Sequence, residues 1–217
     1  MKNLISLVSY FRKFKVLQIF TIYLRYLIGG AFVMAAVGMG KLSSTPIPLA
    51  LAANKPIQEL EPIQLFFRVM AESGLYWNFI GWSQIIAGGL LMTQRFASLG
   101  AAMFFGIILN IFVITVSYGF TGTPIVTGLM LLAVCFLLLW DIEKWQFLFL
   151  PYSIENLTAP QTLQIIGNTF WEILGLALFI LIFSLYALGF DLLIQMASCL
   201  VLGLIGFVLY FLLQRRN

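Results

Sequence analysis

Five polar or charged side chains stand in or beside long apolar stretches of this sequence. Arg25, Gln84 and Asn110 lie within such stretches, and Lys41 and Arg95 lie at their ends. A polar side chain in apolar surroundings needs a hydrogen-bond partner. The three internal residues are therefore candidate ligand-binding residues that would contact the polar head of a small apolar ligand. For Gln84 and Asn110, interhelical hydrogen bonding is the first expectation and ligand contact is the alternative.

The residue types that the chain lacks limit its chemistry. There is no histidine, which excludes His-ligated haem, His-based zinc or copper sites and a histidine general base. The two cysteines, Cys135 and Cys199, lie far apart in apolar stretches and form no CxxC pair. A thiol relay needs paired, accessible cysteines, so structural thiols are expected instead. We predict no metal site and no catalytic residue, and we expect the chain not to be catalytic on its own.

The composition indicates whether this chain folds in water or in a membrane. Of its 217 residues, 62% are hydrophobic and only 9% are charged, and the mean hydropathy is +1.03. Soluble domains carry about 25% charged residues, so this chain lacks the polar surface to coat a water-soluble globule. It is predicted to be an integral membrane protein. Lys41 and Arg95 are then candidate membrane-anchoring residues.

The apolar stretches have the length of transmembrane helices. A membrane-spanning helix needs about 20 mostly apolar residues, whereas a membrane β-barrel would show alternating segments of about 10 residues. The sequence predicts an all-α polytopic protein with six spans, at 17–39, 76–94, 97–118, 124–141, 169–188 and 191–213. The turn ALGFD, with Gly189 suited to end a helix and Asp191 to begin one, joins the last two as a tight hairpin.

Basic residues predict the orientation. Lys2, Lys13, Arg95, Lys144 and the basic C-terminal residues fall on one side of a six-span chain, so both termini are expected to be cytoplasmic. The sequence pI of about 9.2 then reflects topology and does not indicate nucleic-acid binding. The stretch SYFRKFK mixes basic and aromatic residues, as segments that touch anionic lipid do.

Arg25 has two interpretations within this topology. It lies about 12 Å into the first span, and helical side chains tilt toward the helix N-terminus. We expect its guanidinium to reach the cytoplasmic headgroups, with an internal ion pair as the alternative. Glycines in the first and second spans are expected to let helices approach closely.

The spans and connections divide the chain into four parts. These are an interfacial N-terminus (1–16), a four-helix membrane domain (17–145), a cytoplasmic linker (146–168) and a C-terminal transmembrane hairpin (169–217). The domain includes an outer loop, 42–75, in which Pro62 begins a short amphipathic helix, IQLFFRVMAE. That helix would cap the bundle or lie on the membrane surface; a lid over a ligand cavity is the alternative.

Three stretches resemble the DoxX-like family of membrane proteins. They are RYLIGGAFVMAAVGMGKL (25–42), GWSQIIAGGLLMTQRFASLGAAM (81–103) and LLLWDIEKW (137–145). The family has an arginine early in its first helix, a glycine–lysine ending to that helix and an arginine before the third helix. Arg25, Lys41 and Arg95 stand at these positions. The resemblance covers about 20–145, and Gln84 departs from it where relatives often have a glutamate.

The resemblance implies a place among membrane redox assemblies, in a bacterial inner membrane. The first hypothesis is a non-catalytic accessory or anchoring subunit of a quinone-linked redox complex, with quinone near Arg25, Gln84 and Asn110. The second is a quinone-dependent oxidoreductase subunit with turnover. The third is a membrane assembly factor, chaperone or small-lipid transporter. Membrane lipids and a membrane-protein partner are expected in each case, and nucleic acid in none.

Overall fold

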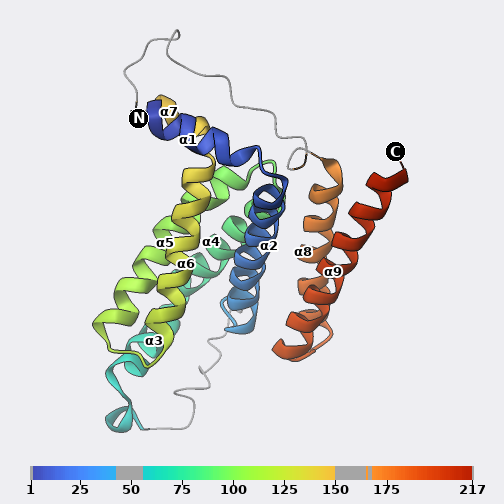
Figure 1. Cartoon of the computed structure of the whole chain (residues 1–217). Helices are drawn as coiled ribbons and strands as arrows, with labels where there is room; N and C mark the ends of the chain where they lie inside the picture. Colours follow the sequence, from blue (N-terminus) through green and yellow to red (C-terminus); the bar gives the residue numbers. More distant parts are fainter. Residues whose placement is uncertain (1, 43–55, 150–164, 166–167, 217) are drawn as a thin grey trace.

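The computed structural model describes residues 2–42, 56–149, 165 and 168–216 as a bundle of helices (Figure 1). No strand occurs among these residues. Parts of the predicted outer loop and most of the predicted cytoplasmic linker fall outside them. The elements are α1 (Lys2–Arg12), α2 (Lys15–Gly38), the 3-10 turn η1 (Ile57–Glu59), α3 (Pro62–Glu72), α4 (Leu75–Met92), α5 (Ala97–Ser117), α6 (Thr123–Trp140), α7 (Ile142–Phe149), α8 (Thr169–Ala187) and α9 (Leu192–Arg216).

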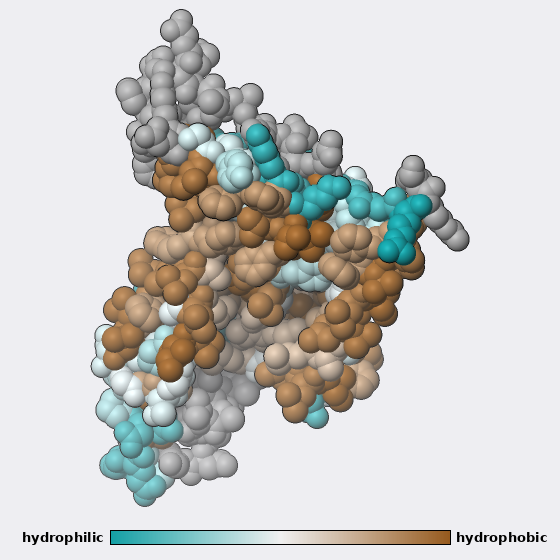
Figure 2. Space-filling model, in the orientation of Figure 1, coloured by the Kyte–Doolittle hydropathy of each residue, from teal (hydrophilic) through white to brown (hydrophobic). Residues whose placement is uncertain are grey.

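The prediction of an all-helical membrane protein is confirmed. Within the described residues, five helices are long and apolar enough to cross a membrane: α2, α5, α6, α8 and α9. The remaining predicted span corresponds to α4, which is not among them because Asn78, Ser83 and Gln84 lower its hydropathy. Hydrophobic residues cover the sides of the bundle and hydrophilic residues gather toward its two ends (Figure 2). Both termini lie at the same end (Figure 1).

Helix α2 is the centre of the bundle. In its most apolar stretch 61% of the residues are buried, against 17–28% in the other four candidate spans. One side of α2 shares an apolar core with α8 and α9 that contains Ile22, Val33 and Trp171. Another side packs with α4, α5 and α6 around Phe32 and Phe104. Residues on α2 are therefore the ones best placed to connect the two halves of the molecule.

Small residues set the closest helix contacts, as the sequence predicted. A Cβ built on Gly29 of α2 would stand 2.7 Å from the carbonyl oxygen of Gly88 in α4, and one on Gly88 would stand 2.6 Å from that of Gly29. Gly100 of α5 meets the backbone of α4 in the same way, 2.7 Å from the Leu91 nitrogen. These glycines let α4 lie directly against α2 and α5, so α4 is an integral part of the bundle.

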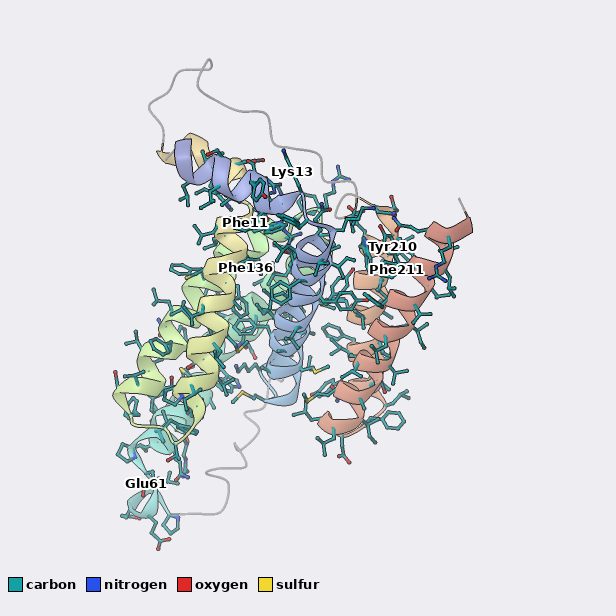
Figure 3. All side chains as sticks on the ribbon, in the orientation of Figure 1. Phe11, Lys13, Glu61, Phe136, Tyr210 and Phe211 are labelled. Atoms are coloured by element: carbon teal, nitrogen blue, oxygen red, sulfur yellow. The ribbon has the colours of Figure 1, made fainter. Side chains whose placement is uncertain are left out.

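The C-terminal hairpin packs onto the rest of the molecule through α8. Asn168 caps this helix by accepting a hydrogen bond from the Phe170 backbone nitrogen at 2.9 Å, and Gly189 takes a φ of +76° in the turn before α9. Tyr23 of α2 donates a hydrogen bond to the Gly203 carbonyl of α9 at 2.8 Å. Tyr210 of α9, labelled in Figure 3, packs against Trp171 of α8 with ring centroids 4.6 Å apart.

Short helices lie at both ends of the bundle. Helices α1 and α7 lie together across the end that carries the termini (Figure 1). At the opposite end, α3 begins with Pro62 in its first turn, and Glu61 and Gln64 form a capping box there. Phe66 of α3 contacts Tyr118 at the end of α5, with ring centroids 5.5 Å apart. These contacts are those of a helix that caps the bundle.

Candidate functional site: a buried charge cluster at one end of the bundle

Arg25 is at the centre of a buried polar cluster. Its side chain is 1% exposed. Its Nη2 donates a hydrogen bond to Oδ2 of Asp141 at 2.8 Å, and its Nη1 donates to Oε1 of Gln94 at 3.0 Å. The planar guanidinium thus holds two acceptors at once, one from the end of α6 and one from the α4–α5 connection. It fixes three segments that are far apart in the sequence.

Asp141 is the main acceptor of this cluster. Besides Arg25, it accepts a hydrogen bond from Oγ of Ser98 at 2.9 Å, and its Oδ1 lies 3.2 Å from Nζ of Lys144. Lys144 also donates to the Ser98 hydroxyl at 2.9 Å. Burial alone would raise the pKa of Asp141, but Arg25 and Lys144 outweigh it and hold that pKa below its usual value. Asp141 is therefore ionised at neutral pH.

Gln94 reaches Arg25 from an unusual backbone conformation. Its φ of 57° lies in the left-handed region, where it is the sole non-glycine among the described residues. A side chain with a Cβ is disfavoured there by about 1–2 kcal/mol. The turn of Thr93, Gln94 and Arg95 nevertheless keeps a glutamine, whose amide oxygen is the second acceptor of the Arg25 guanidinium. Functional and strongly constrained sites are where such strain is retained.

A second buried ion pair connects α1 to α7. Arg12 pairs with Glu143, and both side chains are 3% exposed. Ser9 donates a hydrogen bond to Oε1 of Glu143 at 2.6 Å. Gln18 of α2 donates to the Arg12 carbonyl oxygen at 2.8 Å, which joins this pair to the helix that carries Arg25. The N-terminal interfacial helix is thus fastened to the bundle by charge as well as by apolar contact.

A separate polar contact lies at the opposite end of α2. Nζ of Lys41 donates a hydrogen bond to Oε1 of Gln84 at 2.8 Å and lies 5.1 Å from the centroid of the Trp77 ring. Lys41 is 6% exposed, and burial lowers its pKa to about 8. Gly81 of α4 allows this approach, because a Cβ there would stand 2.6 Å from Cβ of Lys41. Lys41 therefore turns inward rather than outward to the headgroups.

The three candidate ligand-binding residues do not come together. Arg25 and Gln84 belong to different clusters, and α2 alone rises about 20 Å between Arg25 and its end at Gly38. Asn110 lies on the exposed side of α5, with no hydrogen bond to any described residue. These side chains therefore do not line one quinone pocket. Contact of any single one with a ligand stays a prediction.

The two cations expected at the interface differ in their surroundings. Arg95 is exposed, with its guanidinium carbon 5.6 Å from the centroid of the Phe96 ring, in keeping with an interfacial position. Arg25 was expected to reach the headgroups, and that interpretation is wrong. It forms the internal ion pair because its face of α2 turns toward α6 and the α4–α5 connection.

Sequence reasoning missed most members of the cluster. Asp141, Glu143 and Lys144 stand out in the sequence as charges at the end of an apolar stretch, but nothing there pairs Asp141 with Arg25. Gln94 and Ser98 carry no signal of their own. One sequence signal was available: a buried arginine in an apolar span requires a carboxylate at a similar depth, and Asp141 and Glu172 are the acidic residues at the matching ends of spans.

The site has the chemistry of a structural connector. Within the described residues, no group of three or more histidine, cysteine, aspartate or glutamate side chains could hold a metal ion. Cys135 and Cys199 are both free and partly buried. The charged side chains that are buried at this end pair with one another. With their hydrogen-bond partners they fix the positions of α1, α2, α5, α6 and α7 relative to one another.

The fold and the site together define a polytopic, all-helical membrane protein with a buried charge cluster at one end. No protein-family model and no solved structure matches the chain. The chain is similar to the uncharacterized protein YwoB of Bacillus subtilis (strain 168), with 36% identity over 85 residues. The match covers 39% of this chain and 54% of that relative, so the chain spans about half the length of the curated relative it matches.

Proposed function

We propose that this chain is a non-catalytic accessory or anchoring subunit of a quinone-linked membrane redox complex. The observation that supports this most is that the buried charges of the chain form ion pairs between its own helices. Arg25, Asp141, Arg12 and Glu143 form pairs that hold helices to one another. Long exposed apolar faces on α5, α6 and α9 are available to neighbours in the membrane. A rigid bundle with such faces suits a subunit that positions others.

The proposed architecture is DoxX-like, with six membrane crossings and both termini in the cytoplasm of a bacterium. Support comes from α4, which runs the length of the bundle between α2 and α5, and from the position of both termini at one end (Figure 1). Lys13 lies at that end, whereas Glu61 lies at the other (Figure 3). This distribution agrees with the rule that cytoplasmic ends are rich in lysine and arginine.

Quinone enters this proposal as a component of the complex. Because Arg25, Gln84 and Asn110 lie apart, the proposal does not place quinone in a pocket of this chain lined by all three. The three side chains have different environments. Arg25 forms an ion pair with Asp141, Gln84 accepts a hydrogen bond from Lys41, and Asn110 lies on the exposed surface of α5. The redox centres would belong to the partner subunits.

Native mass spectrometry tests the proposal. The full chain is extracted from its own membrane in a mild detergent, and bound small molecules and co-purifying subunits are identified. A redox subunit present at a fixed stoichiometry, with or without quinone, is the expected result. Recovery of the bare chain with bulk lipid alone would contradict a stable redox subunit. A monodisperse size-exclusion profile of the same sample shows that the chain remained folded.

A groove on the C-terminal hairpin favours a second candidate function, that of an assembly factor or small-lipid transporter. The groove is shallow and open, and it lies mostly on α9, with Leu181 as its one lining residue from α8. Its lining is apolar apart from one hydroxyl: Leu181, Ala197, Ser198, Val201, Leu202 and Ile205. A single lipid species that stays bound through extraction, without any redox subunit, would favour this candidate over the first.

A further inference from the structure

The exposed face of α5 carries an amide within the apolar part of a membrane-spanning helix. Asn110 lies about 20 Å along the helix axis from the start of α5 at Ala97 and about 10 Å from its end at Ser117. The side chain is exposed and makes no hydrogen bond to any described residue. Leu99, Leu109 and Val113, which are also exposed on α5, surround it with apolar side chains.

An amide in this position requires a partner from outside the described part of the chain. The hydrocarbon offers no hydrogen bond, so polar groups at this depth face other protein groups rather than lipid. Gln84, an amide near the middle of α4, is 2% exposed and accepts from Lys41. Asn110 has the same chemistry and the opposite environment.

The same face allows a second helix to come close. Gly106, one turn before Asn110, is exposed, and a Cβ built on it would meet nothing within 4 Å. The spacing Gly106–Asn110, with Ser117 further along the face, places small and polar residues where transmembrane helices pack together. The main helix contacts of α5 are with α4 and α6, so the described helices leave this face open (Figure 1).

We propose that this face of α5 is the interface of a homodimer, in which Asn110 of one copy pairs with Asn110 of the other. The partner is assigned to a second copy because an asparagine amide is its own complement: its NH₂ group donates and its oxygen accepts. On a two-fold axis the two side chains satisfy each other through reciprocal hydrogen bonds. Gly106 brings the two helix axes close enough for these short side chains to meet. Two-fold dimers are also the commonest symmetric assemblies.

The proposal does not rest on the function proposed above. An accessory subunit, an assembly factor and a transporter can each act as a dimer. A failure of the dimer would leave the redox-complex proposal standing, and a failure to find a redox subunit would leave the dimer standing.

Energy transfer between copies in vesicles tests the dimer. Full-length chains carrying a donor or an acceptor fluorescent protein at the C-terminus are mixed in phospholipid vesicles over a range of protein-to-lipid ratios. Wild type is expected to give transfer that saturates as a dimer. Asn110→Leu is expected to weaken association about three- to thirtyfold, the range that interhelical hydrogen bonds in membranes span. Gly106→Ile, which would separate the helix axes, is expected to weaken it as well.

Two control variants make the result specific. Asn110→Gln keeps an amide and is expected to retain most of the association. Leu132→Ala, at a 68% exposed position on α6, is expected to leave it unchanged. Association of Asn110→Leu equal to that of wild type would overturn the proposal, as would a wild type that stays monomeric at all ratios. Capture of a different protein through this face, with no self-association, would overturn it too.

Discussion

Removal of the Asp141 carboxylate tests whether the buried cluster holds the bundle together. In Asp141→Ala, the Arg25 guanidinium loses the acceptor at 2.8 Å while its side chain stays 1% exposed. Removal of one partner of a buried ion pair costs about 3–5 kcal/mol, because the other charge is left uncompensated. Lys144 adds little to this figure, since its side chain is 39% exposed and water replaces the lost partner.

The free energy of unfolding provides the measurement. Purified chain in mixed micelles is unfolded reversibly with increasing mole fraction of a denaturing detergent, and helix content is followed by circular dichroism. Asp141→Ala is expected to lose about 3–5 kcal/mol relative to wild type. The double variant Arg25→Met with Asp141→Leu is expected to recover most of this, because a buried ion pair and an apolar pair of similar volume are often nearly equal in stability.

A matched control comes from an exposed ion pair in the same chain. Arg68 and Glu72 of α3 lie 3.1 Å apart with side chains 35% and 59% exposed. Glu72→Ala is expected to change the free energy of unfolding by less than about 1 kcal/mol. A loss below about 1 kcal/mol for Asp141→Ala, or a double variant as unstable as the sum of its two single variants, would refute the reasoning.

Three further predictions concern other features of the structure. Burial lowers the pKa of Lys41 from 10.5 to about 8, so the unfolded chain binds a proton that the folded chain does not between these values. Stability is therefore expected to rise by about 3 kcal/mol from pH 8 to pH 10.5, and Lys41→Met, in the same unfolding assay, should abolish the rise. Gly29→Val, whose Cβ would meet the backbone of α4, is expected to cost about 1–3 kcal/mol, while Gly38→Ala, with nothing within 4 Å, should not destabilise. Gln94→Ala is expected to lower the free energy of unfolding by about 1.5–3 kcal/mol, because the hydrogen bond to Arg25 is lost. Gln94→Gly is expected to lower it by about 1–2 kcal/mol less than Gln94→Ala, because glycine adopts the left-handed backbone without strain. Equal stability of these two variants would show that the backbone is unstrained.

The pH dependence of Asp141 adds an independent check on the cluster. Its pKa is held below the ordinary value of about 3.9 in the folded chain. The stabilisation is then fully present above about pH 4 and is lost as pH falls through the lower, folded pKa. Wild type should lose stability in this acid range, whereas Asp141→Asn should show a shallower dependence there.

Two cations, Arg25 in the middle of α2 and Lys41 just after its end, have a common explanation in the structure. Arg25 pairs inward with Asp141 and Gln94, and Lys41 turns inward to Gln84 and Trp77. Both interactions join α2 to helices that follow it in the sequence. The central helix is therefore fixed by a polar contact at its middle, by another just after its C-terminal end, and by the Gly29 crossing with α4 between them. This arrangement specifies the rotation and depth of α2, which apolar contacts alone do not.

The sequence by itself determined the class of protein and the positions of its helices. Hydropathy, length and the proline and glycine signals are local properties, and the membrane imposes the same demand on every span. Each of the six predicted spans therefore corresponds to a helix, including 76–94, which is α4. Pro62 at the start of α3, Asn168 at the start of α8 and Gly189 at a turn were likewise predictable, because each acts on its own backbone.

Only the tertiary structure decided which polar residues meet. The direction in which a side chain points depends on how its helix is rotated, and that rotation is fixed by packing against segments far away in the sequence. Arg25 was therefore assigned to the headgroups although it pairs with Asp141, a residue separated from it by most of the bundle's sequence. Gln84 and Asn110 illustrate the same point. Both are amides near the middle of a helix, yet α4 turns Gln84 toward Lys41 and α5 turns Asn110 outward, because only the assembled bundle distinguishes an inner face from an outer one.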